Sequence, residues 1–404
     1  MENSWVHKTL GELFVFKNGL NKGKEYFGYG TPIINYMDVY KHPAIKKKYV
    51  QGRVTLSHQE LDRFRVLKGD VFFTRTSETP EEVGMSATLL EDIPNCSFSG
   101  FVLRARPLTD LLIPKYCVYA FTAKEIRASI IKNCTYTTRA LTNGRVLASL
   151  KLPIPSLAEQ QRIASTLSDA DALVAELDVL IEKKRAIMAG TMQEFFTGKR
   201  RLQGFDEPWV DVVFGDKIKI YRGGSPRPIE SYLTNNPNGL NWIKIGDARP
   251  GDKYITKTSE KIIPEGLGAT RAVYSGDFLL SNSMSFGRPY ILKIDGCIHD
   301  GWLAITEYQE TFDRNFLYYL LGSDAILQKF KTLAAGSGVQ NLNKKLVADM
   351  ELQIPSSLAE QHAIATILSD MDAEIAELEA KRDKYKEVRQ GMMQQLLTGK
   401  IRLI

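Results

Sequence analysis

The sequence predicts an α+β protein in which two mixed β-rich domains stand in tandem, each followed by a long α-helix. Three observations support this fold class: a tandem duplication, a long apolar heptad pattern in each copy, and short apolar runs bounded by turns. The predicted domains are residues 1–152 and 203–352, and the predicted helical segments are residues 153–202 and 353–404. A chain of 404 residues is also too long for a single hydrophobic core.

The duplication is clearest in the helical segments. Residues 157–202 begin Leu-Ala-Glu-Gln and end Thr-Gly-Lys-Arg-Arg-Leu, and residues 358–403 match them at a constant offset of 201. About half of these positions are identical. In the globular parts the match is fainter and the offset shifts, as where Gly69-Asp70 returns as Gly276-Asp277. Insertions and deletions in loops explain a shifting offset.

Each long helix has a predicted start and end. A serine followed three residues later by a glutamate forms an S-x-x-E capping box at Ser156 with Glu159 and at Ser357 with Glu360. Each segment ends at Thr-Gly-Lys, where Gly198 or Gly399 can adopt the left-handed conformation. A helix of about 40 residues is roughly 60 Å long.

The apolar spacing within these helices alternates between three and four residues, which predicts that the two helices pair as an antiparallel coiled coil. The alternative, a helix packed only on its own domain, would use a wider apolar stripe. The predicted seam consists of Ile163, Leu167, Val174, Leu177, Ile181, Ile364, Leu368, Ile375, Leu378 and Tyr385. Polar breaks at Lys184, Arg382 and Arg389 can fix the register.

The globular segments contain short runs that are typical of strands. These runs are Phe14-Val15-Phe16, Tyr49-Val50, Val71-Phe72-Phe73, Trp242-Ile243-Lys244-Ile245 and Phe278-Leu279-Leu280. Shorter helices are expected near residues 115–131 and 314–331.

Composition restricts the class of protein. Four scattered cysteines without a C-x-x-C pair favour a reducing cytoplasm and argue against a zinc site. No apolar run approaches 18 residues, so no membrane span is expected, and the start lacks the features of a signal peptide. Residues 1–150 contain 21 Lys and Arg against 14 Asp and Glu, which is compatible with a phosphate backbone as partner.

The sequence contains no constellation for catalysis. Asn236-Pro237-Asn238 fails the methyltransferase pattern at its third position, and no Walker loop is present. His299-Asp300 is interpreted as an ordinary hydrogen-bonded histidine, since no two histidines stand four residues apart. The Asp-x-Asp pairs at 169/171 and 370/372 are interpreted as solvated acidic residues near helix starts. We therefore expect no catalytic residue, no metal and no cofactor bound by this chain.

The alternation of two divergent domains with two similar helices resembles the DNA-specificity subunits of type I restriction–modification enzymes. The Leu-Ala-Glu-Gln helix start, present twice, carries the resemblance most specifically. Tyr221-Arg222-Gly223-Gly224-Ser225-Pro226, Trp242-Ile243-Lys244-Ile245-Gly246-Asp247 and Pro32-Ile33-Ile34-Asn35-Tyr36-Met37-Asp38-Val39 are similar to the recognition-domain motifs of that family.

The resemblance implies a non-catalytic subunit that reads an asymmetric bipartite target in double-stranded DNA through two target-recognition domains. It implies as partners two methyltransferase subunits, which dock on the helices, and restriction/translocase subunits. These partners would use S-adenosylmethionine, ATP and Mg²⁺. Phosphate contacts would position the protein, and loop side chains would read the bases.

The candidate DNA-binding residues are basic or amide and hydroxyl side chains in predicted loops. In the first domain they are Asn21, Lys22, Lys24, Lys46, Lys47, Lys48, Arg53, Arg75, Thr76 and Arg139. In the second domain they are Arg222, Ser225, Arg227, Lys244, Asn282, Ser283, Arg288, Lys344 and Lys345. Two alternatives stay open: a specificity subunit for a type II-like enzyme that fuses methylation and cleavage, and a coiled-coil scaffold that never binds DNA.

Overall fold

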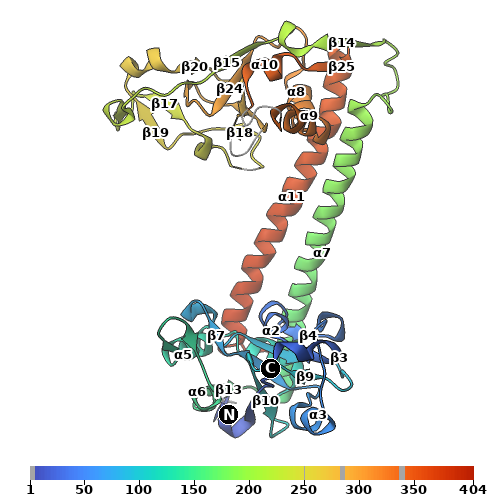
Figure 1. Ribbon diagram of the computed structural model, residues 1–404, viewed down its shortest axis with the longest axis vertical. Helices are drawn as coiled ribbons and strands as arrows, with labels where there is room; N and C mark the ends of the chain where they lie inside the picture. The colour runs from blue at the N-terminus through green and yellow to red at the C-terminus, as the bar shows by residue number, and fades with distance from the viewer. Residues whose placement is uncertain (1–4, 250, 283–286, 336–341) are drawn as a thin grey trace. The chain divides into compact units, whose positions relative to one another are not determined.

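The computed structural model describes residues 5–249, 251–282, 287–335 and 342–404. The chain divides into two compact units, and each unit holds one domain together with part of both long helices (Figure 1). The first unit comprises Met1–Asp178 with Lys381–Ile404, and the second comprises Val179–Ala380. The limits of the units therefore lie inside the helices.

The main sheet of the first unit is built from buried, Val- and Phe-rich runs, as the sequence predicts. In sheet order its strands are β2 (Phe14–Asn18), β10 (Val102–Pro107), β6 (Val71–Thr74), β8 (Ser86–Leu89) and β4 (Ala44–Ile45). Every residue of β6 is buried. Gly69, at a φ of +92°, forms the turn just before this strand, and that conformation favours glycine.

Smaller elements surround this sheet. The remaining strands are β1 (Val6–Thr9) paired with β13 (Lys151–Ile154); β3 (Phe27–Ile34) between β5 (Arg53–Val54) and β9 (Ser97–Phe98); and β12 (Ala140–Leu141) between β11 (Thr135–Tyr136) and β7 (Thr76–Ser77). The helices are α1 (Leu10–Leu13), α2 (Tyr36–Lys41), α3 (His58–Phe64), α4 (Pro114–Ala120), α5 (Lys124–Lys132) and α6 (Gly144–Ala148), with 3₁₀ turns η1 (Lys24–Tyr26), η2 (Lys47–Tyr49) and η3 (Pro80–Glu82).

The second unit repeats the strand order of the main sheet, and its second sheet has five strands. Its main sheet is β15 (Lys219–Arg222), β24 (Trp302–Thr306), β21 (Phe278–Ser281), β22 (Pro289–Leu292) and β18 (Tyr254–Ile255); its second sheet is β16 (Leu233–Thr234), β19 (Glu260–Ile262), β17 (Leu240–Ile243), β23 (Gly296–Ile298) and β20 (Arg271–Val273). The other elements are β14 (Trp209–Val213) paired with β25 (Glu351–Pro355), helices α8 (Arg314–Gly322), α9 (Asp324–Ala335) and α10 (Lys344–Ala348), and 3₁₀ turns η4 (Phe214–Asp216), η5 (Ile229–Ser231), η6 (Ile245–Asp247) and η7 (Pro264–Ala269).

Strand pairing shows that the duplication extends through both domains. The last strand of each main sheet, β4 or β18, joins its neighbour in parallel, whereas the other pairs of that sheet are antiparallel. The second parallel pair, β3 with β9, also returns as β17 with β23.

Several local predictions were wrong. Tyr49 lies in the 3₁₀ turn η2 and not in a strand, and its ring stacks on His42 with 3.9 Å between the ring centroids. Strand β17 ends at Ile243, where Lys244 caps η6, so the predicted strand is two residues too long. The helices expected near 115–131 and 314–331 are each broken in two, at Phe121–Ala123 and at Ser323.

The long helices α7 (Leu157–Phe196) and α11 (Leu358–Leu396) pack side by side and antiparallel (Figure 1). In the first unit, Asp171 pairs with Arg389 and Asp178 pairs with Arg382 at 3.5 Å, so residue numbers rise along one helix as they fall along the other. In the second unit, Lys184 pairs with Glu374 at 2.6 Å. The three polar breaks in the seam therefore each pair with an acidic residue of the other helix.

Most of the predicted seam is buried. Leu177, Ile181 and Ile375 are buried, while Val174, Leu378 and Tyr385 are half-buried. The seam residues nearest the helix starts serve a second purpose, because Ile163 and Leu167 belong to the core of the first domain and Ile364 and Leu368 to that of the second. Truncating such a fully buried leucine to alanine costs about 2–5 kcal/mol.

The capping boxes form only in part. Ser156 accepts a hydrogen bond from the backbone N–H of Glu159 at 3.2 Å, but the Glu159 carboxylate turns away from the cap. It binds Trp5 and Arg402 instead, and Glu360 likewise binds Trp209 and Arg201. A charged partner for a buried carboxylate outweighs a cap N–H, so this part of the prediction was wrong. At the other ends, Gly198 and Gly399 adopt the expected left-handed conformation.

Among the helices that the structure describes, none combines the length and hydropathy needed to cross a membrane.

Candidate nucleic-acid interface

In the first domain, the structure gathers four of the predicted residues around the small sheet β11-β12-β7. Thr76 lies in β7, and Arg139 directly precedes β12, which pairs with β7. Arg75 precedes β7, and its guanidinium Nη1 donates to the carbonyl of Gly100 at 2.9 Å. The same Gly100 follows a bridge to Leu20, which places Asn21 beside this turn.

Charge in this cluster is only partly available to a ligand. Arg139 is exposed and pairs with the equally exposed Glu78 at 3.1 Å, a pair that water and salt screen strongly. Arg75 is half-buried, and its Nε has no hydrogen-bond partner among the described residues. Arg75 therefore supports the turn, and Arg139 is the cation of the cluster that is open to solvent.

The other candidates of the first domain lie on separate elements. Lys22 is engaged internally, since its Nζ binds Glu60 at 2.7 Å and lies 4.4 Å from the Tyr26 ring centroid. Arg53 donates to the carbonyls of Val50 and Gly52. The exposed lysines are Lys24 in η1 and Lys46, Lys47 and Lys48 at η2.

In the second domain, three predicted residues line one cavity of about 700 Å³. Ser225, Arg227 and Lys244 lie on its wall together with His299 and Asp300. Lys244 pairs with Glu260 at 2.5 Å. The Ser225 hydroxyl is buried and has no partner among the described residues, so it is available to a ligand that enters. A concave site with a few convergent polar groups is typical of ligand recognition.

Asn282 connects this cavity to the main sheet. It follows β21 and is 3% exposed, and its Nδ2 donates to the carbonyl of Asp300 at 2.9 Å. This bond is the counterpart of the Arg75 bond to Gly100, because Arg75 and Asn282 follow corresponding strands. In both domains, the turn that follows β9 or β23 is therefore held by the side chain that follows β6 or β21 of the main sheet.

The remaining candidates of the second domain are exposed or outside the described residues. Arg222, Arg288, Lys344 and Lys345 are exposed. Lys344 Nζ lies 6.0 Å from the Tyr221 ring centroid, at the start of α10. Ser283 lies outside the residues that the structure describes.

Sequence reasoning missed several neighbours of these clusters. Phe101 and Tyr136 are 68% and 56% exposed in the first domain. The carbonyl of Phe101 accepts a hydrogen bond from the backbone N–H of Arg75, and Tyr136 pairs across strands with Ala140, the residue after Arg139. In the second domain, Arg271 lies 4.7 Å over the Tyr221 ring, and His299 packs edge-on against Trp242. Exposed aromatic side chains near arginine are suited to bases and sugars, but only the fold brings them together.

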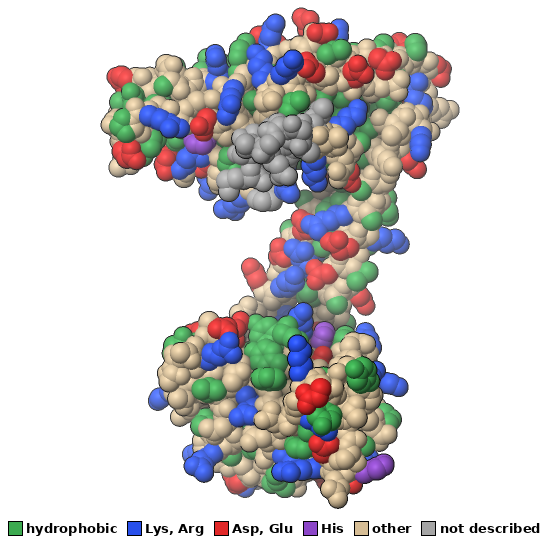
Figure 2. Space-filling view, viewed as in Figure 1, with side chains coloured by type: hydrophobic (Ala, Val, Ile, Leu, Met, Phe, Trp, Pro, Cys, Tyr) green, Lys and Arg blue, Asp and Glu red, His purple; other side chains and the backbone are tan. Residues whose placement is uncertain are grey.

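On the face that Figure 2 shows, the basic side chains of the described residues do not form one continuous patch. On the face drawn in Figure 2, Lys and Arg are interspersed with Asp and Glu over both units. The described residues contain no group of three or more His, Cys, Asp or Glu side chains placed to hold a metal ion.

The repeated Leu-Ala-Glu-Gln motif fixes each domain on the helices. Its glutamine is fully buried in both copies: Gln160 bonds to Leu111, Ile113 and Pro155, and Gln361 bonds to Thr311, Asp313 and Pro355. Its glutamate is also buried in both copies, where Arg402 and Arg201 hold Glu159 and Glu360. The motif is thus structural, whereas its first residue, Leu157 or Leu358, is exposed.

Comparison with known proteins agrees with this architecture. Residues 2–183 and 206–387 each match the family described as Type I restriction modification DNA specificity domain. The putative type I restriction enzyme MjaX specificity subunit of Methanocaldococcus jannaschii is 27% identical over 99% of this chain and 94% of its own. The MjaVIII specificity subunit of the same organism is 24% identical over 71% of this chain and 70% of its own.

A solved structure shows the same fold. The type I restriction–modification S subunit from M. genitalium superimposes with a TM-score of 0.56 at 18% sequence identity, covering 98% of this chain and 97% of that one.

Proposed function

The chain belongs to the family of type I restriction–modification DNA specificity subunits, and from this premise we propose that its two domains read two different DNA half-sites. The observation that supports this is the contrast at corresponding turns. Arg75 in the first domain stands where Asn282 stands in the second, and Ser99 stands where His299 stands. Because different side chains hold the two turns, the turns would present different groups to the base edges, and domains that differ in this way would select different sequences.

The contacts would divide by chemistry. Exposed lysines, such as Lys46–Lys48 in the first domain and Lys344 and Lys345 in the second, are suited to phosphates and would position the protein. The clusters around Arg139 and around the cavity with Ser225 carry directional donors and would read base edges. The chain would act in the cytoplasm, where the DNA is.

We further propose that the long helices bind two methyltransferase subunits. Ile187 and Val388 occupy the same position of the repeat, and each is 47% exposed, which is unusual for a large apolar side chain. Glu176 and Glu377 are also equivalent and exposed. Arg162 is less suitable for a test, because it donates to the carbonyl of Leu403 and its counterpart is Ala363. Two equivalent surfaces would give two bound partners.

Methylation and cleavage would reside in the partners. The methyltransferase subunits would bind S-adenosylmethionine, and restriction/translocase subunits would use ATP and Mg²⁺. The specificity family is non-catalytic, and this chain would determine which DNA sequence is bound and would provide the surface on which the other subunits assemble.

The test is a binding titration of the purified chain, with its methyltransferase subunits, on duplexes that carry the target found by methylation mapping. Affinity should fall steeply as salt rises, with a slope that reports the number of phosphate contacts. Scrambling either half-site should weaken binding by several powers of ten. Equal affinity for target and scrambled duplexes would refute sequence reading, and absence of any binding would favour the scaffold alternative.

Assembly is tested separately with Ile187→Asp and Val388→Asp. Each single variant should lose about one of the two methyltransferase subunits, because one of two equivalent sites is altered. Ala172→Asp, an exposed position on α7 in the first unit, is the matched control. An intact complex in the double variant would show that the helices do not carry the interface.

A further inference from the structure

Four cations gather at one edge of the main sheet of the first domain, and none of them is among the candidates predicted from the sequence. Lys17 of β2 stands directly opposite Arg104 of β10, and Arg106 follows on the same face of β10. Arg63 lies in the last turn of α3, and its guanidinium carbon and the Lys17 Nζ are 5.4 and 5.5 Å from the centroid of the same Phe64 ring. We call these four residues the cation cluster. Like charges directly opposite each other destabilise a sheet.

The positive charge of the cation cluster is compensated only in part. Among the ion pairs of the described residues, the one that reaches the cluster joins the buried Asp70 to Arg106 at 2.7 Å. Burial lowers the pKa of Lys17, and the neighbouring charges of Arg104, Arg63 and Arg106 lower it further. Four positive charges against one negative charge leave an excess that an anion can neutralise.

Arg104 is the buried member of the cluster. It is 6% exposed, its Nη1 donates to the carbonyl of Arg65 at 2.7 Å, and its Nε has no partner among the described residues. Removing a guanidinium from water without a full set of partners destabilises the folded state. Arg104 is too buried to touch a ligand, but its charge raises the positive potential at the more exposed side chains of Lys17, Arg63 and Arg106.

Some contacts of the cluster are structural. Lys17 donates to the carbonyl of Arg63, and Arg104 and Arg106 both donate to the carbonyl of Arg65. These bonds hold the C-terminal end of α3 on the sheet. A carbonyl is a neutral acceptor, so these bonds leave the excess of positive charge in place.

The second domain builds the same sheet from neutral residues at the corresponding positions. Strand pairing aligns β2 with β15 and β10 with β24. The residues that replace Lys17, Arg104 and Arg106 are Tyr221, Ala304 and Thr306. The shared fold therefore does not require the cation cluster, which is a property of the first domain.

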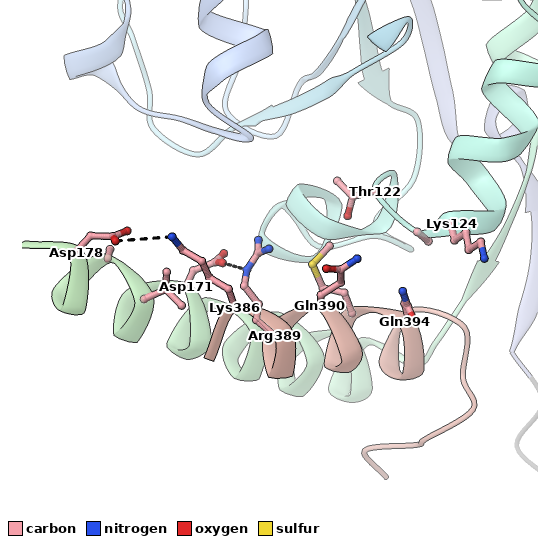
Figure 3. Close-up of a pocket in the computed structure, with 12 residues that line it drawn as sticks. Thr122, Lys124, Asp171, Asp178, Lys386, Arg389, Gln390 and Gln394 are labelled. Atoms are coloured by element: carbon pink, nitrogen blue, oxygen red, sulfur yellow. Dashed lines mark hydrogen bonds and ion pairs between the residues drawn. The ribbon is translucent and has the colours of Figure 1, made fainter. Parts of the chain in front are cut away.

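A cavity beside the long helices of the first unit shows the opposite arrangement of charge. Figure 3 shows this cavity of about 880 Å³, with dashed lines that join Asp171 to Arg389 and Asp178 to Lys386. Acidic and basic side chains thus alternate along its wall and pair with each other. The cation cluster is the better site for an anion.

The aspartate in this cavity also attaches the domain to the helix. Asp171 accepts a hydrogen bond from the Tyr119 hydroxyl at 2.8 Å, and in the second unit the Tyr319 hydroxyl lies 3.3 Å from Asp372. These two aspartates are therefore bound and not solvated, so the interpretation from the sequence was wrong for them. Their contacts explain these charges without a ligand.

The cation cluster lies near the turn that we propose to read bases. In that turn, the backbone N–H of Gly100 donates to the carbonyl of Leu20 at 2.6 Å. Leu20 follows Lys17 by three residues and Gly100 precedes Arg104 by four, which at about 3.3 Å per residue is at most roughly 10 and 13 Å. The major groove of B-DNA is about 12 Å wide and 8.5 Å deep, so a phosphate at its edge is roughly 10 Å from a base edge on its floor. The two spacings agree.

We propose that the cation cluster binds one phosphodiester group of the DNA backbone beside the half-site that the first domain reads. This inference rests on the proposed reading of two half-sites. Lys17, Arg63 and Arg106 present N–H donors to the phosphate oxygens, and Arg104 strengthens the positive potential from inside the domain. Hydrogen bonds between cationic side chains and phosphate are stronger than those between neutral groups. The contact is independent of base sequence, because every nucleotide carries the same phosphate.

The first experiment compares wild type with the double variant Lys17→Met/Arg63→Met, each in complex with the methyltransferase subunits, on target and scrambled duplexes over a range of salt. The double variant should bind both duplexes about eightfold more weakly at about 0.1 M salt, because one phosphate contact releases about 0.9 counterion. The slope of log affinity against log salt should fall by about one. Lys17→Arg/Arg63→Lys, which keeps both charges, should retain the wild-type slope.

The second experiment locates the phosphate on the DNA. Each duplex of a series carries one uncharged methylphosphonate at a different backbone position around the first half-site. Wild type should lose about eightfold in affinity at one position. The double variant should lose nothing further at that position, because its contact is already absent.

Control variants separate this contact from a general loss of charge. Lys132→Met/Lys151→Met removes two exposed cations from other elements of the same domain and should change affinity less than twofold. Thermal unfolding shows whether each variant is folded. If the double variant is not, Arg63→Met alone alters an exposed side chain and is measured on the same methylphosphonate series.

Two results would overturn the inference. One is an equal loss for wild type and the double variant at every methylphosphonate position. The other is stabilisation by inorganic phosphate of wild type and not of the double variant, with equal binding to DNA, which would make the cluster a site for a free anion. Failure of wild type to distinguish target from scrambled duplexes would instead refute the proposed function, while the methylphosphonate series would still decide whether the cluster binds a phosphate.

Discussion

Replacing Glu159 with glutamine should destabilise the first unit by about 2–3 kcal/mol. The Glu159 carboxylate is buried and accepts hydrogen bonds from Trp5 at 3.1 Å and from Arg402 at 2.7 and 2.8 Å. Glutamine keeps the shape but loses the charge and one acceptor oxygen, which removes the ion pair with Arg402. The cost stays below that of a fully buried pair because the Arg402 side chain is 27% exposed and can be rehydrated.

The effect should depend on pH in a defined direction. The hydrogen bonds from Arg402, helped by Trp5, lower the pKa of Glu159 below its ordinary value of 4.5. A carboxylate with a lowered pKa contributes stability that is complete above its unfolded value and is lost as pH falls through its folded value. The difference in unfolding free energy between wild type and Glu159→Gln should therefore be full at pH 7 and shrink below pH 4.5.

Urea unfolding of the full chain, followed by tryptophan fluorescence, measures this difference. Asp169→Asn is the matched control, since Asp169 is exposed on the same helix and its neutralisation should change stability by less than about 0.5 kcal/mol. Glu360→Gln should act equally on the second unit, where Arg201 holds Glu360 at 2.7 Å. A Glu159→Gln variant as stable as the control, or a difference that persists unchanged at pH 3, would refute the reasoning.

The remaining predictions concern activity, spacing and thiol chemistry. The purified chain, free of partners, should show no nuclease, methyltransferase or ATPase activity, and methyl transfer by the isolated chain would contradict this. Inserting four residues after Leu180 should displace the following part of α7 by about 6 Å and change the preferred DNA spacer by about one or two base pairs with the half-sites unchanged. Methylation mapping of the insertion variant is the test, and an unaltered spacer with full activity would contradict this prediction. Cys134, the half-buried cysteine, should react first with iodoacetamide, because Cys96, Cys117 and Cys297 are buried with a pKa raised to about 12; mass spectrometry identifies the first site.

Periodic features could be predicted from the sequence, and features that depend on tertiary partners could not. The heptad pattern and the glycine ends located α7 and α11 to within a few residues because these signals are local. The predicted capping boxes were wrong in part because the glutamates bind distant arginines instead of the caps. These arginines, Arg402 and Arg201, lie more than 150 residues in sequence from Glu159 and Glu360. Tyr49 was assigned to a strand because its pattern is apolar, but stacking on His42 favours the turn.

The candidate DNA-binding residues show the same limit. Residue type alone predicted that Lys22, Arg53 and Asn282 would be free for a ligand, yet each is engaged by carboxylate or carbonyl groups of its own domain. The exposed aromatics Phe101 and Tyr136 carry no local signal and become candidates only because the fold places them beside the Arg75 and Arg139 turns. Their binding roles stay predictions that the half-site titration can test.

The two halves of the internal duplication keep the residues that hold a domain on the helices, and they differ in the residues that hold the turns. Glu159 and Gln160 return unchanged as Glu360 and Gln361, and the tyrosine–aspartate contact returns as well. Arg75 and Asn282, by contrast, differ although both hold the same turn. Attachment and recognition therefore rest on separate side chains. It follows that exchanging the turn residues between the domains should change the DNA sequence that is read without loss of assembly, whereas replacing the Glu-Gln pair in either copy should weaken both.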